Sequence, residues 1–430
     1  MFLARVRNNV FKTKSLSPQH SAVKWHRRRL LFVCIKVSKY QKNDTIKYMH
    51  KYYFIFGKTP QLSLAEIKNV LFLTKIEFKQ ILQQNELFII ESKEKIDNKI
   101  FYRLGGQIKF GEIIGQIQRL NANELIKTID LKQTNKIQFG ISDYTNQKLK
   151  INKLGIEIKK IIKQSRPCRF VSPKTQNLTA VVVKKNKLID QGIELCIFEQ
   201  RGIFLIGKTL AVQDFELWNK LDYGRPEFDP KIGMLPPKVA QMMINLIPQK
   251  TKTIWDPFCG FGTILQQAAI LGYENIFGSD INASTILKAQ KNIDWLLENF
   301  NLTVNIEMKT LDITKATAKD LKFLPQAIVT EPYLGKPLTG KENQADLNKI
   351  KKELQLLYLK SFEKFSKLLG SKHIVVFIFP KLKSKKQIID TSIDENIKQL
   401  GYNLLNEFDY SRPGQHLVRR ITIWKIAVKR

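Results

Sequence analysis

The chain has 430 residues, 43% of them hydrophobic and 10% aromatic, which is enough for two or three domains with buried cores. Its 72 Lys and Arg against 38 Asp and Glu give a formal net charge of +34, which favours a polyanionic partner, most simply nucleic acid. A surface coated with lysines because of biased composition is the alternative. Four cysteines without CxxC spacing and five scattered histidines indicate neither a disulfide framework nor a metal site, and a reducing cytoplasm fits best. No apolar run approaches the roughly 20 residues of a membrane span, so we expect a soluble protein.

Residues 1–48 hold twelve Lys and Arg against the single acid Asp44, with little patterning. Three interpretations stay open: a transit peptide, a short tail that grips RNA, or an extension upstream of a true start at Met49. We expect a basic extension that is either untranslated or disordered.

Residues 49–220 predict an α+β region. A strand over 51–57 precedes a helix over 62–72, for which Ser63 is a plausible N-cap and Glu66 its capping-box partner. Further strand signals, a basic helix and a hairpin follow in the segments 86–92, 107–114, 136–144, 154–164 and 194–211. Arg166 and Arg169 flank a Ser- and Pro-rich turn, where they either grip phosphates or form solvated surface charge.

A boundary is predicted near 222–237, which is rich in Pro and Gly, and a helix begins at Pro237. Strand and helix signals then alternate five times, and a closing pair of strands surrounds Arg412-Pro413-Gly414. The predicted strands are 253–256, 274–280, 304–312, 326–332, 373–380, 406–411 and 417–428. This order predicts a Rossmann-like, doubly wound parallel sheet with an antiparallel terminal hairpin. Class I methyltransferases are built on such a sheet.

The stretch TIWDPFCGFGT, residues 253–263, has the order strand, glycine-rich turn, helix of a nucleotide-binding unit. Gly260 and Gly262 let the backbone approach a ligand, and the helix that opens near Thr263 presents free N–H groups to an anionic group. Cys259 is expected to be a small buried spacer, because no histidine or metal pattern accompanies it.

Acids end the first three strands of this region. Asp256 precedes the turn, Asp280 can accept bonds from both ribose hydroxyls of a nucleoside cofactor, and Asp312 can meet the adenine edge. Each could instead cap a helix, but three acids at successive strand ends are more specific than any one.

The stretch IVTEPYLGKPL, residues 328–338, ends the fourth strand. Methylation of an exocyclic base nitrogen needs a base presented face-on, with its amino hydrogens held by acceptors. Pro332 would fix the loop, Tyr333 would stack on the base, and Thr330 or Glu331 would supply a side-chain acceptor. The alternative has Tyr333 as a buried anchor and Glu331 as a surface acid.

DPFCGFGT resembles the cofactor motif of the THUMP-type RNA guanine-N2 methyltransferases, particularly those that modify position 10 of tRNA, and EPYLG stands where they carry DPPYG. The resemblance is strongest over 225–430 and weaker over 50–220, and residues 1–48 are outside it. It implies a THUMP-like, RNA-binding region at 49–220 and a catalytic domain at 221–430.

The resemblance also implies roles for individual residues. S-adenosylmethionine (SAM) would be bound by Asp256, Phe258, Gly260, Gly262, Thr263, Asp280 and Asp312, and the base by Thr330, Glu331, Pro332 and Tyr333. The family's motif opens with Asp, whereas this chain has Thr330 followed by Glu331. Either Glu331 takes the part of that carboxylate or the target atom differs.

We therefore expect a SAM-dependent methyltransferase acting on RNA, most simply at guanine N2 in tRNA. Two alternatives are a DNA methyltransferase acting on adenine N6 or cytosine N4, and a non-catalytic RNA-binding protein that keeps the fold.

Overall fold

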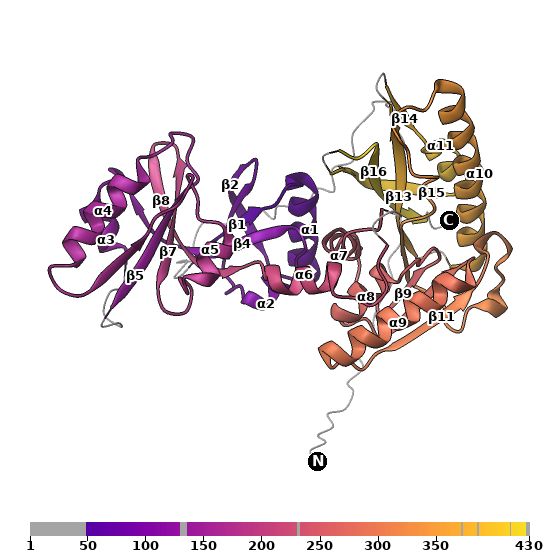
Figure 1. Cartoon of the computed structure of the whole chain (residues 1–430), viewed down its shortest axis with the longest axis horizontal. Coiled ribbons are helices and arrows are strands. Elements are labelled where there is room, and N and C mark those ends of the chain that lie inside the picture. Colours follow the sequence, from indigo (N-terminus) through magenta and orange to yellow (C-terminus); the bar gives the residue numbers. More distant parts are fainter. Residues whose placement is uncertain are drawn as a thin grey trace, which may run out of the picture. The chain divides into compact units, whose positions relative to one another are not determined.

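The computed structural model describes residues 49–129, 136–229, 233–370, 373–384, 387–412 and 414–426. Residues 48–430 form one compact unit that contains two large sheets (Figure 1). The basic extension and Cys34 lie outside the described residues, so the interpretations of that segment stay predictions.

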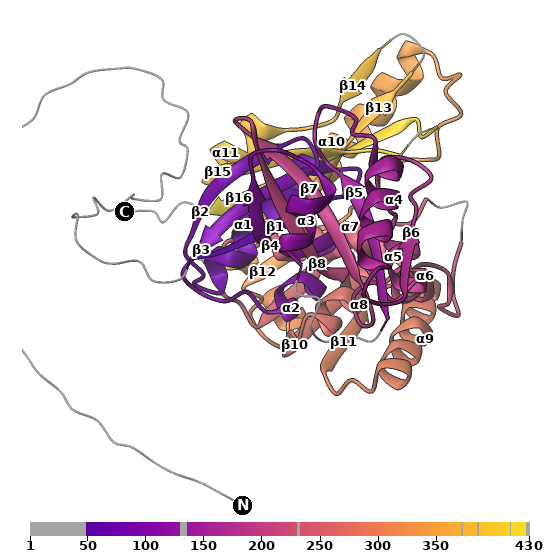
Figure 2. The same ribbon diagram turned by 90° about the vertical axis from the view of Figure 1, so that its left-hand side faces the viewer.

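The first sheet has eight strands, and all its pairings are antiparallel except those of β5 with β6 and β7. Helices α1 (Pro60–Leu73) and α2 (Asn98–Tyr102) belong to its first half, and α3 (Ala122–Lys127), α4 (Ile151–Ile162) and α5 (Ala180–Lys185) to its second half. Figure 2 shows α4 beside the parallel strands that it contacts. In spatial order the strands are β2 (Phe78–Gln84), β3 (Leu87–Ser92), β1 (His50–Phe56), β4 (Gln107–Ile117), β8 (Ile203–Val212), β7 (Ile193–Gln200), β5 (Ile137–Asp143) and β6 (Cys168–Val171).

A buried ion pair lies in the middle of this sheet. The Lys109 ammonium on β4 contacts the Glu194 carboxylate on β7, and both side chains are almost fully buried. The hydroxyls of Ser142 and Thr209 donate to the same carboxylate at 2.6 and 2.7 Å. Because a buried charge is tolerated only when it is paired and hydrogen-bonded, this network holds β4, β5, β7 and β8 in one register.

The second sheet confirms the predicted doubly wound architecture. Five strands are parallel, and the terminal hairpin adds two antiparallel strands beside β13. A short strand, β14 (Ile388–Asp390), also pairs with β13 and was not predicted. In spatial order the strands are β11 (Asn305–Thr310), β10 (Asn275–Asp280), β9 (Thr253–Asp256), β12 (Ala327–Thr330), β13 (Ile374–Lys383), β16 (Leu417–Ile426) and β15 (Tyr402–Tyr410).

Helices cover both faces of this sheet because its strands are apolar on both sides. Ile254 belongs to the core under α7 (Pro237–Asn245), α8 (Thr263–Ile270) and α9 (Ala283–Phe300). Its neighbour Trp255 belongs to the core under α10 (Gln344–Leu368) and α11 (Asp394–Gln399). The same alternation at Ile328 and Val329 on β12 is the period of two that a strand imposes.

The capping box predicted at Ser63 and Glu66 is wrong. Helix α1 begins at Pro60, three residues before Ser63, so the side chains of Ser63 and Glu66 both lie inside the helix on its buried face. The Glu66 carboxylate accepts hydrogen bonds from the backbone N–H groups of Gly105 and Gly106 at 2.7 and 2.9 Å, and from the Asn245 amide on α7 at 2.8 Å. Glu66 therefore joins the first sheet to the second instead of capping a helix.

The contact between α1, the Gly105-Gly106 turn and α7 is close. A Cβ on Gly105 would lie 2.4 Å from the carbonyl oxygen of Lys238, so only glycine fits there. The Asn69 amide on α1 donates to the carbonyl oxygens of Asn245 and Ile247 at 2.7 and 2.8 Å. Direct backbone contacts of this kind leave little freedom for sliding at this junction.

Candidate active site

The turn between β9 and α8 has the backbone that its glycines predicted. Gly260 and Gly262 have φ angles of +51° and +83°, in the left-handed region that favours glycine. Gly262 directly precedes α8, and within the described residues no side chain caps this helix. The first N–H groups of α8 and the positive end of its dipole therefore lie next to the turn. Cys259 is buried there, and burial raises the pKa of its thiol well above the ordinary value.

Asp256 lies at the carboxyl end of β9 and is 2% exposed. Its carboxylate accepts hydrogen bonds from the Phe258 N–H at 3.2 Å and from the Thr330 hydroxyl at 2.6 Å. Burial raises the pKa of Asp256 to about 8, even though these hydrogen bonds act to lower it. Asp256 thus connects the glycine turn with the end of β12.

The acids of the next two strands lie beside this turn. Asp280, half-buried at the end of β10, accepts hydrogen bonds from the Gly260 N–H at 3.2 Å and the Asn282 N–H at 2.9 Å. Asp312, after β11, accepts from the backbone and hydroxyl of Thr314 and caps a short 3-10 helix. Burial acts to raise the pKa of Asp312, but the bonds from Thr314 and the charge of Lys315 bring it below its ordinary value. Asp256, Asp280 and Asp312 thus lie at the carboxyl ends of β9, β10 and β11, which are neighbours in the sheet.

The loop after β12 is held from two sides. Thr330 is fully buried, with its hydroxyl directed to Asp256. The Glu331 carboxylate accepts from the Arg419 guanidinium on β16 at 2.6 Å. Burial raises the pKa of Glu331, and the charge of Arg419 opposes that shift. Tyr333 is 54% exposed, while its carbonyl oxygen accepts from the Tyr358 hydroxyl at 2.8 Å. Its ring is therefore presented to solvent on a fixed backbone.

Two arginines of this region were missed in the sequence. Arg419 is 3% exposed and donates to Glu331, to Gln415 and to the carbonyl oxygen of Gly233. Arg225 is equally buried and donates to the Thr263 hydroxyl at 2.8 Å. Arg419 lies 88 residues from its carboxylate, so only the pairing of β16 with β13 brings the two groups together.

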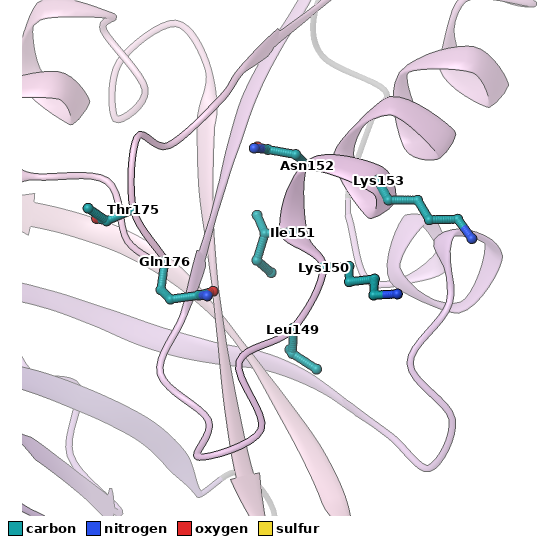
Figure 3. Close-up of a pocket in the computed structure, with 7 residues that line it drawn as sticks. All are labelled: Leu149, Lys150, Ile151, Asn152, Lys153, Thr175 and Gln176. Carbon is teal, nitrogen blue, oxygen red and sulfur yellow. The ribbon is translucent and has the colours of Figure 1, made fainter.

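Arg166 and Arg169 belong to the first sheet, whereas the site above belongs to the second. Arg169, on β6, is exposed and donates to Gln138 and Asn186 at 3.2 and 3.1 Å. A hollow of about 180 Å³ opens near the start of α4 (Figure 3). Thr175 and Gln176 line one side of it, and the side chains of Lys150 and Lys153 point away from them in Figure 3. The complete lining is Leu149, Lys150, Ile151, Asn152, Lys153, Thr175 and Gln176.

No cluster of His, Cys, Asp and Glu suited to a metal ion occurs among the residues that the structure describes. In the same part of the chain, no helix is both long and apolar enough to cross a membrane.

Comparison with known proteins matches residues 227–403 to the family described as RMKL-like, methyltransferase domain. The tRNA (guanine(10)-N2)-dimethyltransferase of Methanothermobacter thermautotrophicus is 25% identical over 286 residues, which cover 64% of this chain and 75% of that protein. The enzyme of the same name from Pyrococcus abyssi is 24% identical over 315 residues, which cover 71% of this chain and 84% of that protein. The crystal structure of TrmN from Thermus thermophilus shares the fold, with a TM-score of 0.52 at 13% identity, and covers 88% of this chain and 100% of that one.

A doubly wound sheet with a terminal antiparallel hairpin and a matching family model define a class I methyltransferase, whose methyl donor is SAM. Within that class the chain is similar in sequence to proteins named tRNA (guanine(10)-N2)-dimethyltransferase, which is the family that its motifs resemble. The residues of the turn suit this cofactor, because a nucleoside needs hydroxyl acceptors at a strand end and an amino-acid moiety needs donors at a helix start.

Proposed function

We propose that this chain transfers methyl groups from SAM to the exocyclic N2 of a guanine in tRNA, with position 10 as the first candidate. The observation that carries the proposal is the extent of the similarity. The matches to the two tRNA (guanine(10)-N2)-dimethyltransferases run over 286 and 315 residues, longer than the segment 227–403, so they reach beyond the methyltransferase domain. Similarity that extends outside the catalytic domain supports a shared substrate more strongly than a catalytic domain alone.

In the proposed cofactor site, Asp280 accepts bonds from the ribose hydroxyls, while Gly260, Gly262 and Thr263 surround the methionine end. The half-buried position of Asp280, already bonded to the Gly260 N–H, supports this arrangement. Asp312 would lie near the adenine, as would Phe258, and Asp256 would hold the turn against β12. SAM supplies an electrophilic methyl group when bound, so these residues need only orient it.

In the proposed base site, the exposed ring of Tyr333 stacks on the flipped guanine, and buried Pro332 keeps the loop extended. Thr330 is buried, so we assign it the indirect role of holding Asp256. Glu331 then becomes the side-chain acceptor for the amine hydrogens, because it directly follows, in sequence, the position where the family's motif carries Asp. Arg419 orients Glu331, and its charge opposes the rise in the pKa of Glu331 that burial causes. The released proton would pass to Glu331 or to solvent.

The first sheet is proposed to bind RNA as a THUMP-like region over 49–220, next to a catalytic domain over 221–430. Support comes from the net charge of +34 and from the lysines of α4. Arg169 lies on the neighbouring strand β6, and Arg166 lies two residues before that strand begins. Phosphate contacts from such residues would position the tRNA without reading its sequence.

Transfer of labelled methyl from SAM to a tRNA transcript, compared with duplex DNA, tests the proposal. Label in tRNA alone is expected, and label in DNA alone would overturn it in favour of a DNA methyltransferase. Asp280→Ala, which lacks the proposed acceptor for the ribose hydroxyls of SAM, is the negative control and should transfer no label.

A non-catalytic RNA-binding role is the second candidate. It is favoured by one observation: the Thr330 hydroxyl and the Glu331 carboxylate both have partners inside the protein. Calorimetry separates the two, because a chain that binds tRNA but not SAM would be non-catalytic.

A further inference from the structure

Arg225 is a buried cation without a buried anion. It precedes α7, in the segment between α6 (Phe215–Tyr223) and Gly233, and is 3% exposed. Its Nη1 donates to the Thr263 hydroxyl at 2.8 Å and its Nη2 contacts the Met234 sulfur at 3.8 Å. Its Nε is buried with no hydrogen-bond partner among the described residues. No ion pair among the described residues includes Arg225. Burial lowers the pKa of Arg225, and the charge of half-buried Asp222 opposes that shift without forming an ion pair with the guanidinium.

The position of this guanidinium makes the missing anion more significant. Thr263 is the first residue of α8, so the guanidinium lies at the positive end of that helix. A cation at a helix N-terminus is the unfavourable arrangement, and burial increases the cost because water cannot screen the two charges. The ring of Phe228, 5.8 Å from the guanidinium carbon, offsets part of this cost but supplies no hydrogen-bond acceptor. An anion between Arg225 and the start of α8 would pair with the guanidinium and accept from the free N–H groups of the helix.

The turn beside this anion position identifies the kind of anion. Gly262 directly precedes Thr263, Gly260 lies two residues before Gly262, and this turn is where the methionine end of SAM is proposed to lie. That end carries a carboxylate, and the planar fork of a guanidinium matches a carboxylate in geometry. We propose that Arg225 binds the carboxylate of the methionine moiety of SAM and thereby selects cofactors that carry it. This inference rests on the proposed cofactor site.

The test compares SAM with decarboxylated SAM, which lacks only that carboxylate, by calorimetry on the full chain. Wild type is expected to bind SAM about 10- to 100-fold more tightly, the range for a charge-assisted hydrogen bond pair. Arg225→Gln should bind SAM weakly and decarboxylated SAM as well as wild type does, so that the preference disappears. Asp280→Asn is the matched control, because losing a ribose acceptor should weaken both ligands equally and keep the ratio.

An equal loss of both ligands in Arg225→Gln, or an unchanged preference, would overturn the proposal and leave Arg225 a structural residue. If Arg225→Gln does not fold by circular dichroism, Thr263→Val gives the second measurement. This change removes the acceptor that orients Arg225 and should lower the preference several-fold, whereas an unchanged ratio counts against the proposal. A wild-type chain that binds neither ligand would contradict the proposed cofactor site itself. That result differs from the results that overturn only the role of Arg225.

Discussion

Glu66 offers a sharp prediction, because three hydrogen-bond donors from two parts of the chain converge on one buried carboxylate. Replacement by alanine leaves three donors unpaired: the N–H groups of Gly105 and Gly106 and one N–H of the Asn245 amide, whose other N–H still donates to the carbonyl oxygen of Arg103. Each unpaired buried donor costs about 1–3 kcal/mol, so Glu66→Ala should lose at least about 3 kcal/mol of stability. Glu66→Gln keeps one acceptor oxygen, so it should lose only about 1–3 kcal/mol.

Urea unfolding followed by tryptophan fluorescence measures these losses as shifts in the midpoint. Hydrogen exchange at the Gly105 and Gly106 amides gives a local readout, and exchange should accelerate in Glu66→Ala. The exposed Glu86, at the turn before β3, is the matched control, and Glu86→Ala should stay within about 0.5 kcal/mol of wild type. Equal midpoints for Glu66→Ala and Glu86→Ala would refute the reasoning.

The same residue predicts a pH dependence with a definite sign. Burial raises the pKa of Glu66 from its ordinary 4.5 to about 7, despite the hydrogen bonds that lower it. Between these values the folded chain keeps a proton that the unfolded chain has lost, so stability falls as pH rises. The loss amounts to about 3 kcal/mol over that window. Glu66→Gln, which cannot titrate, should reduce this slope, whereas Glu86→Gln should keep it.

Four further predictions concern the buried ion pair and the candidate site. Lys109→Met leaves the Glu194 carboxylate without its cation and should lower the free energy of unfolding in urea by about 3–5 kcal/mol. The double variant that also carries Glu194→Leu should recover most of that stability. A double variant no more stable than Lys109→Met alone would contradict this. Gly262→Ala puts a Cβ at a φ of +83° and should cost about 1–2 kcal/mol in thermal unfolding, so an unchanged melting temperature counts against that strain. Asp280→Ala should abolish SAM binding in calorimetry with unchanged circular dichroism, and unaltered affinity would remove Asp280 from the ribose role. Glu331→Gln should slow methyl transfer at least about tenfold, because its carboxylate is the proposed acceptor; wild-type activity would exclude that role.

The second sheet was predictable because its signals are local. The inner parallel strands β9, β12 and β13 contain apolar runs, and the edge strand β11 alternates polar and apolar residues. The residue order at Asp256, Gly260 and Gly262 predicts a strand, a turn and a helix start. The terminal hairpin was equally visible. Strand β14 was missed because three residues are too few to show a period.

Contacts across long stretches of sequence could not be predicted. Glu66 has the spacing of a capping box from Ser63, and nothing local shows that Gly105 and Gly106 will meet its carboxylate. Arg419 and Glu331 meet only because β16 pairs with β13. Arg225 stands in a Pro- and Gly-rich segment that has no periodicity, so its burial against Thr263 leaves no pattern in the sequence.

The central claim, methyl transfer to guanine N2 in tRNA, is tested most directly by nucleoside mass spectrometry of a tRNA transcript incubated with the full chain and SAM. We predict N2-methylguanosine or its N2,N2-dimethyl form, and neither in a transcript in which adenosine replaces guanosine 10. A methyl group on a different nucleoside would contradict the claim. So would unmodified tRNA under conditions where the chain binds both SAM and the transcript.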